Sequence, residues 1–141
     1  MKKIICLLVL VIISGCYSLG NLDRLRMHNR QNLMKLHIGM TKEEALEIMG
    51  TQTATDYFYS QRVTATNPYR SEILQGKDKT LEIIYYYTDK KGASFHPMSG
   101  MTGIADDELT PLVFDEGKLI GWGWSFLQEN IQKYEIRWRE E

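Results

Sequence analysis

The sequence contains little cysteine, no apolar run long enough to cross a bilayer, and no excess of charge of one sign. Its longest apolar run is the ten residues 4–13, whereas a helix that crosses the hydrocarbon core needs about 20. The 17 basic and 18 acidic side chains give a formal net charge of −1, which argues against nucleic acid as a partner. No nucleophile elbow or catalytic triad pattern appears. We therefore expect a protein that is not an enzyme and has no membrane-spanning helix.

The residues around this run predict a lipid anchor. Lys2 and Lys3 precede it, and a basic segment followed by an apolar one is typical of a secretory signal. The run leads into "ISGC", residues 13–16, which resembles the bacterial lipobox. The resemblance implies that the Cys16 thiol receives a diacylglyceryl group, that the chain is cleaved before Cys16, and that the new amino terminus is acylated. Because Cys6 would be discarded, no disulfide, cysteine metal site or catalytic thiol would remain. A soluble secreted protein and an uncleaved N-terminal helix are the alternatives.

The predicted division of the chain follows from this anchor. We expect residues 1–15 to be the removed signal peptide, residues 16–22 the lipidated tether, and residues 23–141 a single domain. One acyl chain of roughly 16 carbons contributes of order 10 kcal/mol to membrane binding, so the bilayer is a predicted partner through Cys16. Tyr17 stands where an aspartate is the usual inner-membrane retention signal. This predicts the periplasmic face of the outer membrane if the source is Gram-negative.

The segment that follows the anchor, residues 21–37, is basic. It carries Arg24, Arg26, Arg30 and Lys35 against the single acidic residue Asp23. Cations near anionic headgroups contribute up to about 1 kcal/mol each, so the segment could lie on an anionic membrane surface. It could equally be the solvated face of a helix.

Two N-terminal helices are predicted. Four leucines recur at spacings compatible with one helical stripe over residues 22–36. Thr41 and Glu44 have the spacing of a capping box, and Gly50 can take the left-handed conformation that ends a helix, so we predict a second helix over residues 42–49.

Two antiparallel hairpins are predicted after these helices. The stretches "PYRSEIL" (68–74) and "TLEIIYYYT" (80–88) flank a turn-forming segment, and "LTPLVFDEGKLIGWGWSF" (109–126) reads as a hairpin that turns at Gly117. Apolar residues at both odd and even positions indicate that the 80–88 strand is central or is covered on part of both sides. Residues 54–65 could add an edge strand.

The second strand of the later hairpin is predicted to have a bulky face and a bare face. The bulky face would carry Ile120, Trp122, Trp124 and Phe126, and the bare face Gly121 and Gly123. Strand glycines often mark a close approach by another backbone, such as that of a helix lying across the sheet. An exposed aromatic platform for a partner is the alternative.

Helical spacing of apolar residues in the tail predicts a terminal helix that packs on the sheet. Together these elements define an α+β fold: two N-terminal helices packed on one face of a roughly four-stranded antiparallel sheet, with a short C-terminal helix.

Three stretches carry a family resemblance. The order in "LHIGMTKEEALEIMGT", together with "YYYTD" and "DDELTPLVFDEGKLIGWGWSF", resembles small bacterial lipoproteins of the SmpA/OmlA type, whose fold is shared with BamE and the β-lactamase inhibitor protein. The later stretches look closer still to an uncharacterised lipoprotein family. The chain departs from the pattern where Thr51-Gln52-Thr53, without the usual proline, follow Gly50. The resemblance implies a non-enzymatic envelope protein that binds other proteins or supports outer-membrane assembly.

A loop over residues 89–109 contains the candidate ligand site. Its "FHPMSGM" stretch holds His96, Met98 and Met101, whose imidazole and sulfur ligands suit Cu(I). A mobile loop, or one that contacts a partner, is the alternative. The acidic residues 106–108 lack the spacing of a calcium loop and predict a solvated turn.

For function, we expect a lipid-anchored envelope protein that acts as a protein-interaction or structural module, in outer-membrane assembly or maintenance, without a cofactor. The candidate partner-binding residues are Tyr57, His96, Met98, Met101 and Trp138. The alternative is a lipoprotein that binds a ligand or a soft metal such as copper through the 89–109 loop.

Overall fold

The computed structural model describes residues 20–58, 61–77, 79–90 and 103–134. Its elements, in chain order, are α2 (Asn21–Leu33), α3 (Lys42–Met49), β1 (Thr53–Phe58), β2 (Gln61–Thr66), β3 (Arg70–Gln75), β4 (Thr80–Tyr87), η1 (Asp106–Glu108), β5 (Leu109–Asp115), β6 (Lys118–Trp122) and α4 (Trp124–Lys133). Within these ranges no helix is both long and apolar enough to cross a membrane.

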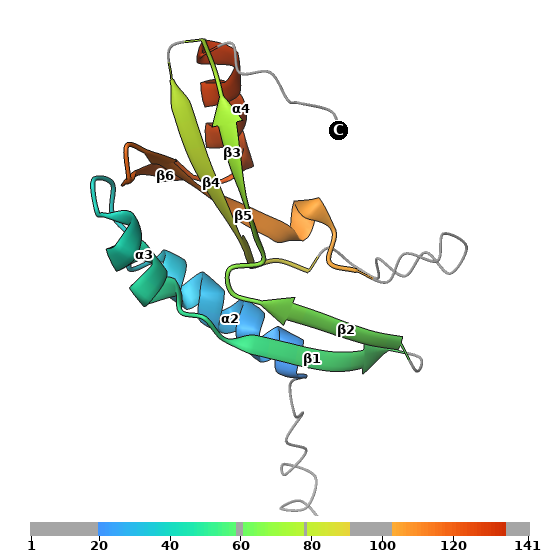
Figure 1. Ribbon diagram of the computed structural model, residues 1–141. Coiled ribbons are helices and arrows are strands. Elements are labelled where there is room, and N and C mark those ends of the chain that lie inside the picture. The colour runs from blue at the N-terminus through green and yellow to red at the C-terminus, as the bar shows by residue number, and fades with distance from the viewer. Residues whose placement is uncertain (1–19, 59–60, 78, 91–102, 135–141) are drawn as a thin grey trace, which may run out of the picture.

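The main sheet has four antiparallel strands in the order β3-β4-β5-β6, which confirms both predicted hairpins and the central place of β4. Each face of β4 packs in a separate core. Leu81, Ile83, Tyr85 and Tyr87 pack with Leu127 of α4, whereas Ile84 and Tyr86 pack with Ala45 and Met49 of α3. In Figure 1, α2 and α3 lie to the lower left of the sheet and α4 lies beside the upper ends of β3 and β4. The predicted α+β class is confirmed.

Helix α3 forms where the sequence predicts it. The Thr41 hydroxyl accepts a hydrogen bond from the Glu44 amide at 3.2 Å, and the Glu44 carboxylate accepts one from the Thr41 amide at 2.8 Å. These bonds also hold the pKa of the Glu44 carboxyl below its usual value. Gly50 ends the helix at a φ of 74°. Helix α2 ends at Leu33 rather than at residue 36, because the chain turns there and carries Leu36 into the α3 core.

The predicted edge strand over residues 54–65 is wrong. This segment is instead a hairpin of its own, β1–β2, that packs along α2. Its inner face supplies Ala54, Val63 and Ala65 to the core that contains Leu22 of α2. The Asp56 carboxylate accepts hydrogen bonds from the Asn21 and Leu22 amides at 3.0 and 2.8 Å, so β1 supplies the N-terminal cap that α2 lacks in its own sequence.

Two buried asparagines join this layer to the sheet. Asn29 of α2 and Asn67, which follows β2, exchange side-chain hydrogen bonds of 3.0 and 2.6 Å. The Asn29 amide group also donates to the Tyr87 carbonyl at 2.7 Å, and that of Asn67 to the Met49 carbonyl at 3.2 Å. One polar cluster therefore connects α2, α3, β4 and the end of the β1–β2 hairpin.

The prediction that Trp124 and Phe126 lie on a strand is also wrong. Strand β6 ends at Trp122, Gly123 has a φ of 93°, and α4 begins at Trp124. The predicted close approach by another backbone is not what Gly121 accommodates: its neighbour is a side chain, because a Cβ there would lie 2.6 Å from the Phe126 ring. That side chain belongs to α4, the helix that the chain forms directly after β6.

A Gly121→Ala substitution is expected to lower the free energy of unfolding by about 1–3 kcal/mol, because the added methyl group overlaps the Phe126 ring. Urea unfolding measures the loss. In the double variant Gly121→Ala/Phe126→Leu, the loss in the free energy of unfolding should be about 1 kcal/mol smaller than the sum of the losses in the two single variants. Gly103→Ala is the matched control, since no atom lies within 4 Å of a Cβ at that position. Equal effects at the two glycines would contradict this account.

Candidate binding surface

Most of the residues predicted to bind a partner or a metal lie outside the described part of the chain. These are Cys16, His96, Met98, Met101 and Trp138. Tyr57 is described: it lies on β1 opposite Arg62, and 71% of its surface is exposed. Its exposure is compatible with a contact residue, although it does not line the depression described below.

The acidic turn is less solvated than predicted. Residues 106–108 form the short helix η1, and Glu108 is buried. Its carboxylate accepts a hydrogen bond from the Ala105 amide at 3.1 Å, and Asp106 lies 2.9 Å from Arg70 of β3. Among the residues described, no group of three or more His, Cys, Asp or Glu could hold a metal ion.

An open depression of about 730 Å³ lies on the sheet face that also packs against α3. The lining residues are Ile73, Lys79, Thr80, Glu82, Phe114, Asp115, Glu116 and Gly117. Strand register explains why they meet: Ile73 pairs with Glu82 across β3 and β4, and Glu82 pairs with Phe114 across β4 and β5. Phe114 is buried and forms the floor, whereas Ile73 on β3 is 68% exposed.

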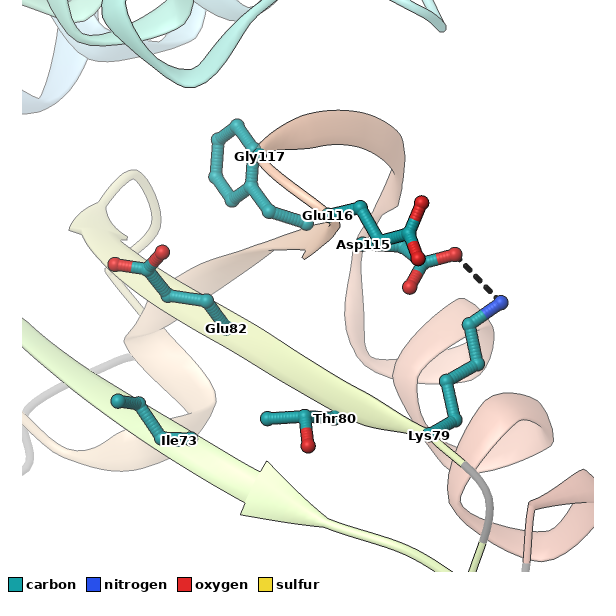
Figure 2. Close-up of a pocket in the computed structure, with 8 residues that line it drawn as sticks. Ile73, Lys79, Thr80, Glu82, Asp115, Glu116 and Gly117 are labelled. Atoms are coloured by element: carbon teal, nitrogen blue, oxygen red, sulfur yellow. Dashed lines mark ion pairs between the residues drawn. The ribbon is translucent and has the colours of Figure 1, made fainter.

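Ion pairs lie at two borders of this depression. At one border Glu82 accepts two hydrogen bonds, of 2.9 and 3.0 Å, from Lys42 of α3. At the other, Lys79 pairs with Asp115, as Figure 2 shows. The Asp115 carboxylate raises the pKa of Lys79, which therefore stays charged. Glu82 and Asp115 are paired with lysines in this way, and Glu116 adds a third carboxylate to the lining, so the depression offers a partner an apolar floor with charged borders.

Strand β3 forms one side of the depression and is an edge of the sheet. It pairs with β4 alone within the described residues, so the main-chain groups on its other side face outward. An edge of this kind can accept an added strand from another protein, and exposed side chains beside it supply specificity. Ile73 is such a side chain.

The buried tyrosines next to this surface do not act as acids or bases near neutral pH. Burial raises the pKa of Tyr86 to about 12. Its hydroxyl has no hydrogen-bond partner among the residues the structure describes. Tyr86 is therefore a neutral core side chain.

The sequence contains a weak signal for the depression. Alternation along "RSEILQ" places Ser71, Ile73 and Gln75 on one face of β3, but an isolated apolar residue on such a face is not unusual. Only the register across three strands brings Ile73 beside Glu82 and Phe114. The sequence analysis therefore did not identify Ile73 as a residue of a binding surface.

The fold and this surface define a small α+β domain with an open depression beside β3, a strand that pairs with β4 alone in the described part of the chain. A family model described as "Protein of unknown function (DUF3192)" matches residues 9–129, and the chain belongs to that family. No curated protein and no solved structure matches the chain.

Proposed function

We propose that this protein is a lipid-anchored module of the cell envelope that binds another protein. The observation that carries the proposal is the depression beside β3, which is an edge strand among the residues the structure describes; there an exposed apolar side chain lies beside paired charges. The lipobox at Cys16 supplies the anchor. The resemblance to SmpA/OmlA-type lipoproteins supports a role in outer-membrane assembly or maintenance, on the periplasmic face of that membrane.

A binding role fits the surface better than catalysis does. General acid–base or nucleophilic catalysis needs a reactive group positioned beside its base, with a pKa suited to transfer a proton. In the depression, Glu82 and Asp115 each face a lysine, and the floor is the apolar Phe114. The third carboxylate, Glu116, has no histidine, serine or cysteine beside it among the lining residues. The residues that line it can hold a segment of another chain without any chemical step.

The second candidate is binding of a soft metal by His96, Met98 and Met101. It rests on ligand type alone, because these residues lie outside the described part of the chain. Stoichiometric Cu(I) binding that is lost in His96→Ala and Met101→Ala would favour it over protein binding.

Photo-crosslinking in cells tests the protein-binding proposal. A photo-reactive residue at Ile73 is expected to crosslink to one recurrent envelope protein, identified by mass spectrometry, because Ile73 borders the depression and is 68% exposed. Tyr57, which is 71% exposed, reports on the β1–β2 hairpin in a parallel experiment. His96, Met101 and Trp138 are the further positions suggested by the sequence.

Filling the depression supplies the control. Thr80→Arg places a long side chain in the depression and should abolish the Ile73 crosslink, whereas Thr66→Arg, on the exposed face of β2, should leave it unchanged. A crosslink that survives Thr80→Arg would show that the depression is not the contact surface. Absence of any recurrent partner from every position would contradict protein binding itself.

A further inference from the structure

The side of α2 that faces away from the core is unusual in composition. Arg24, Met27 and Gln31, with the C-cap residue Met34 directly after the helix, follow one another at helical spacings of three and four residues and define the outer face of α2. The buried residues Leu22, Leu25, Asn29 and Asn32 lie on the opposite side. Met27 is 42% exposed and Met34 is 81% exposed, which makes them two of the five large exposed hydrophobic side chains in the described residues.

The charge around this face is positive. Helix α2 contains three arginines and one acidic residue, Asp23. The Asp23 carboxylate is engaged by Arg26 at 3.3 Å and by Lys90 at 3.8 Å. Arg24 and Arg30 are exposed beside the methionines, and Lys35 follows the helix. Binding of a helix to a membrane interface strengthens with the apolar area that it buries and with the attraction of its cations to anionic lipid, and this face offers both exposed methionines and arginines.

The position of α2 along the chain brings it close to the lipid. Gly20, the first described residue, is four residues after Cys16. An extended chain spans at most about 3.6 Å per residue, so acylation of Cys16 would hold the N-terminal end of α2 within about 14 Å of the bilayer surface. This step rests on the proposed function. In Figure 1 that end of α2 lies at the lower edge of the described part of the molecule, and the upper ends of β3 and β4 lie at the top.

We propose that the outer face of α2 lies on a bilayer that contains anionic phospholipid. Met27 and Met34 enter the boundary between headgroups and acyl chains, and Arg24 and Arg30 bind lipid phosphates. Helix α2 then lies along the membrane, and the anchor and the helix together fix one orientation of the domain. That orientation decides which side of the domain a protein partner can reach.

The test uses the acylated protein with a polarity-sensitive fluorophore on one introduced cysteine. Acylation occupies Cys16, so Met34→Cys and the matched control Ile73→Cys each carry one reactive thiol, at positions 81% and 68% exposed. Each protein is mixed with phosphatidylcholine vesicles, with or without phosphatidylglycerol. The probe at Met34 should shift its emission to shorter wavelength with the anionic vesicles, and the probe at Ile73 should not.

Charge and salt variants sharpen the readout. Arg24→Gln combined with Arg30→Gln should remove most of the shift at Met34, whereas Arg62→Gln, an exposed arginine on β2, should not change it. Salt of about 1 M shortens the Debye length to about 3 Å and should act like the double substitution.

Flotation of the same samples separates the two proposals. Flotation with both vesicle types but identical emission at Met34 and Ile73 would overturn the lipid contact of α2 and leave the anchor standing. Failure to float with phosphatidylcholine vesicles would contradict the anchor, and the present inference with it.

Discussion

A fatty-acid analogue fed to cells is expected to label the wild-type protein and to leave the Cys16→Ser variant unlabelled. The lipobox resemblance makes the Cys16 thiol the acceptor of the diacylglyceryl group, and a serine hydroxyl lacks the thiol that is modified. Each buried methylene contributes about 0.8 kcal/mol, so loss of the acyl chains removes an anchor worth of order 10 kcal/mol per chain. The variant should lose the stable, lipid-dependent membrane attachment of the wild-type protein.

The second cysteine provides the matched control. Cys6→Ser changes a residue inside the segment predicted to be removed and should leave labelling unchanged. Equal labelling of the wild-type and Cys16→Ser proteins would show that the chain is not acylated at this thiol. The proposed envelope anchor would then be wrong.

An Asn29→Asp substitution is expected to lower the free energy of unfolding at neutral pH by about 3 kcal/mol or more. The introduced carboxyl would replace an amide group that donates to the Tyr87 carbonyl and to the Asn67 side chain, and residue 29 is fully buried. The Tyr87 carbonyl oxygen and the Asn67 side-chain oxygen would each lose their hydrogen-bond donor and would face a negatively charged carboxylate instead. Two lost hydrogen bonds and an uncompensated buried charge act in the same direction.

The loss should depend on pH in a defined direction. Burial and the facing oxygens raise the folded-state pKa of the introduced carboxyl above its unfolded value of about 3.9. The folded state then binds more protons than the unfolded state, so stability falls as pH rises from about 3.9 through the folded-state pKa. Urea unfolding of the variant across this range should show the largest deficit above that pKa.

Asn32→Asp is the control on the same helix. Asn32 is also buried, but its side-chain oxygen accepts a hydrogen bond from Lys35 at 2.8 Å and its amide nitrogen lies 3.3 Å from His28. A carboxylate beside a cation keeps a partner, so this substitution should cost much less. Equal losses for Asn29→Asp and Asn32→Asp would indicate that burial alone, rather than the Asn29–Asn67 hydrogen bonds, sets the effect.

The features that were predicted correctly depend on residues close together in the chain. Thr41 and Glu44 complete a capping box within one turn of helix, and Glu116 and Gly117 both have positive φ in the β5–β6 turn. The two faces of β4 follow from alternation within eight residues. In each case the decisive contact or dihedral angle is local, so the pattern of residue types specifies it.

The β6–α4 junction shows how a local pattern can support the wrong element. Aromatic and small residues alternate through Phe126, which predicts a strand, but Trp124, Leu127 and Ile131 also have helical spacing. The structure ends the strand because Gly123 takes a φ of 93° and Leu127 packs on the Tyr85 side of the sheet. The same residues fit both the alternation of a strand and the spacing of a helix, and tertiary packing decides which of the two forms.

The sequence by itself determined the helix cap, the hairpin turns and the α+β class, because short-range chemistry and periodicity carry these features, and the anchor at Cys16 stays a prediction. Tertiary structure alone decided that residues 53–66 form a separate hairpin, that Asn29 bonds Asn67, and that Ile73 borders a depression with Glu82 and Phe114. Periodicity shows which face of an element is apolar, but not which distant element covers that face. That choice depends on register and packing between residues tens of positions apart.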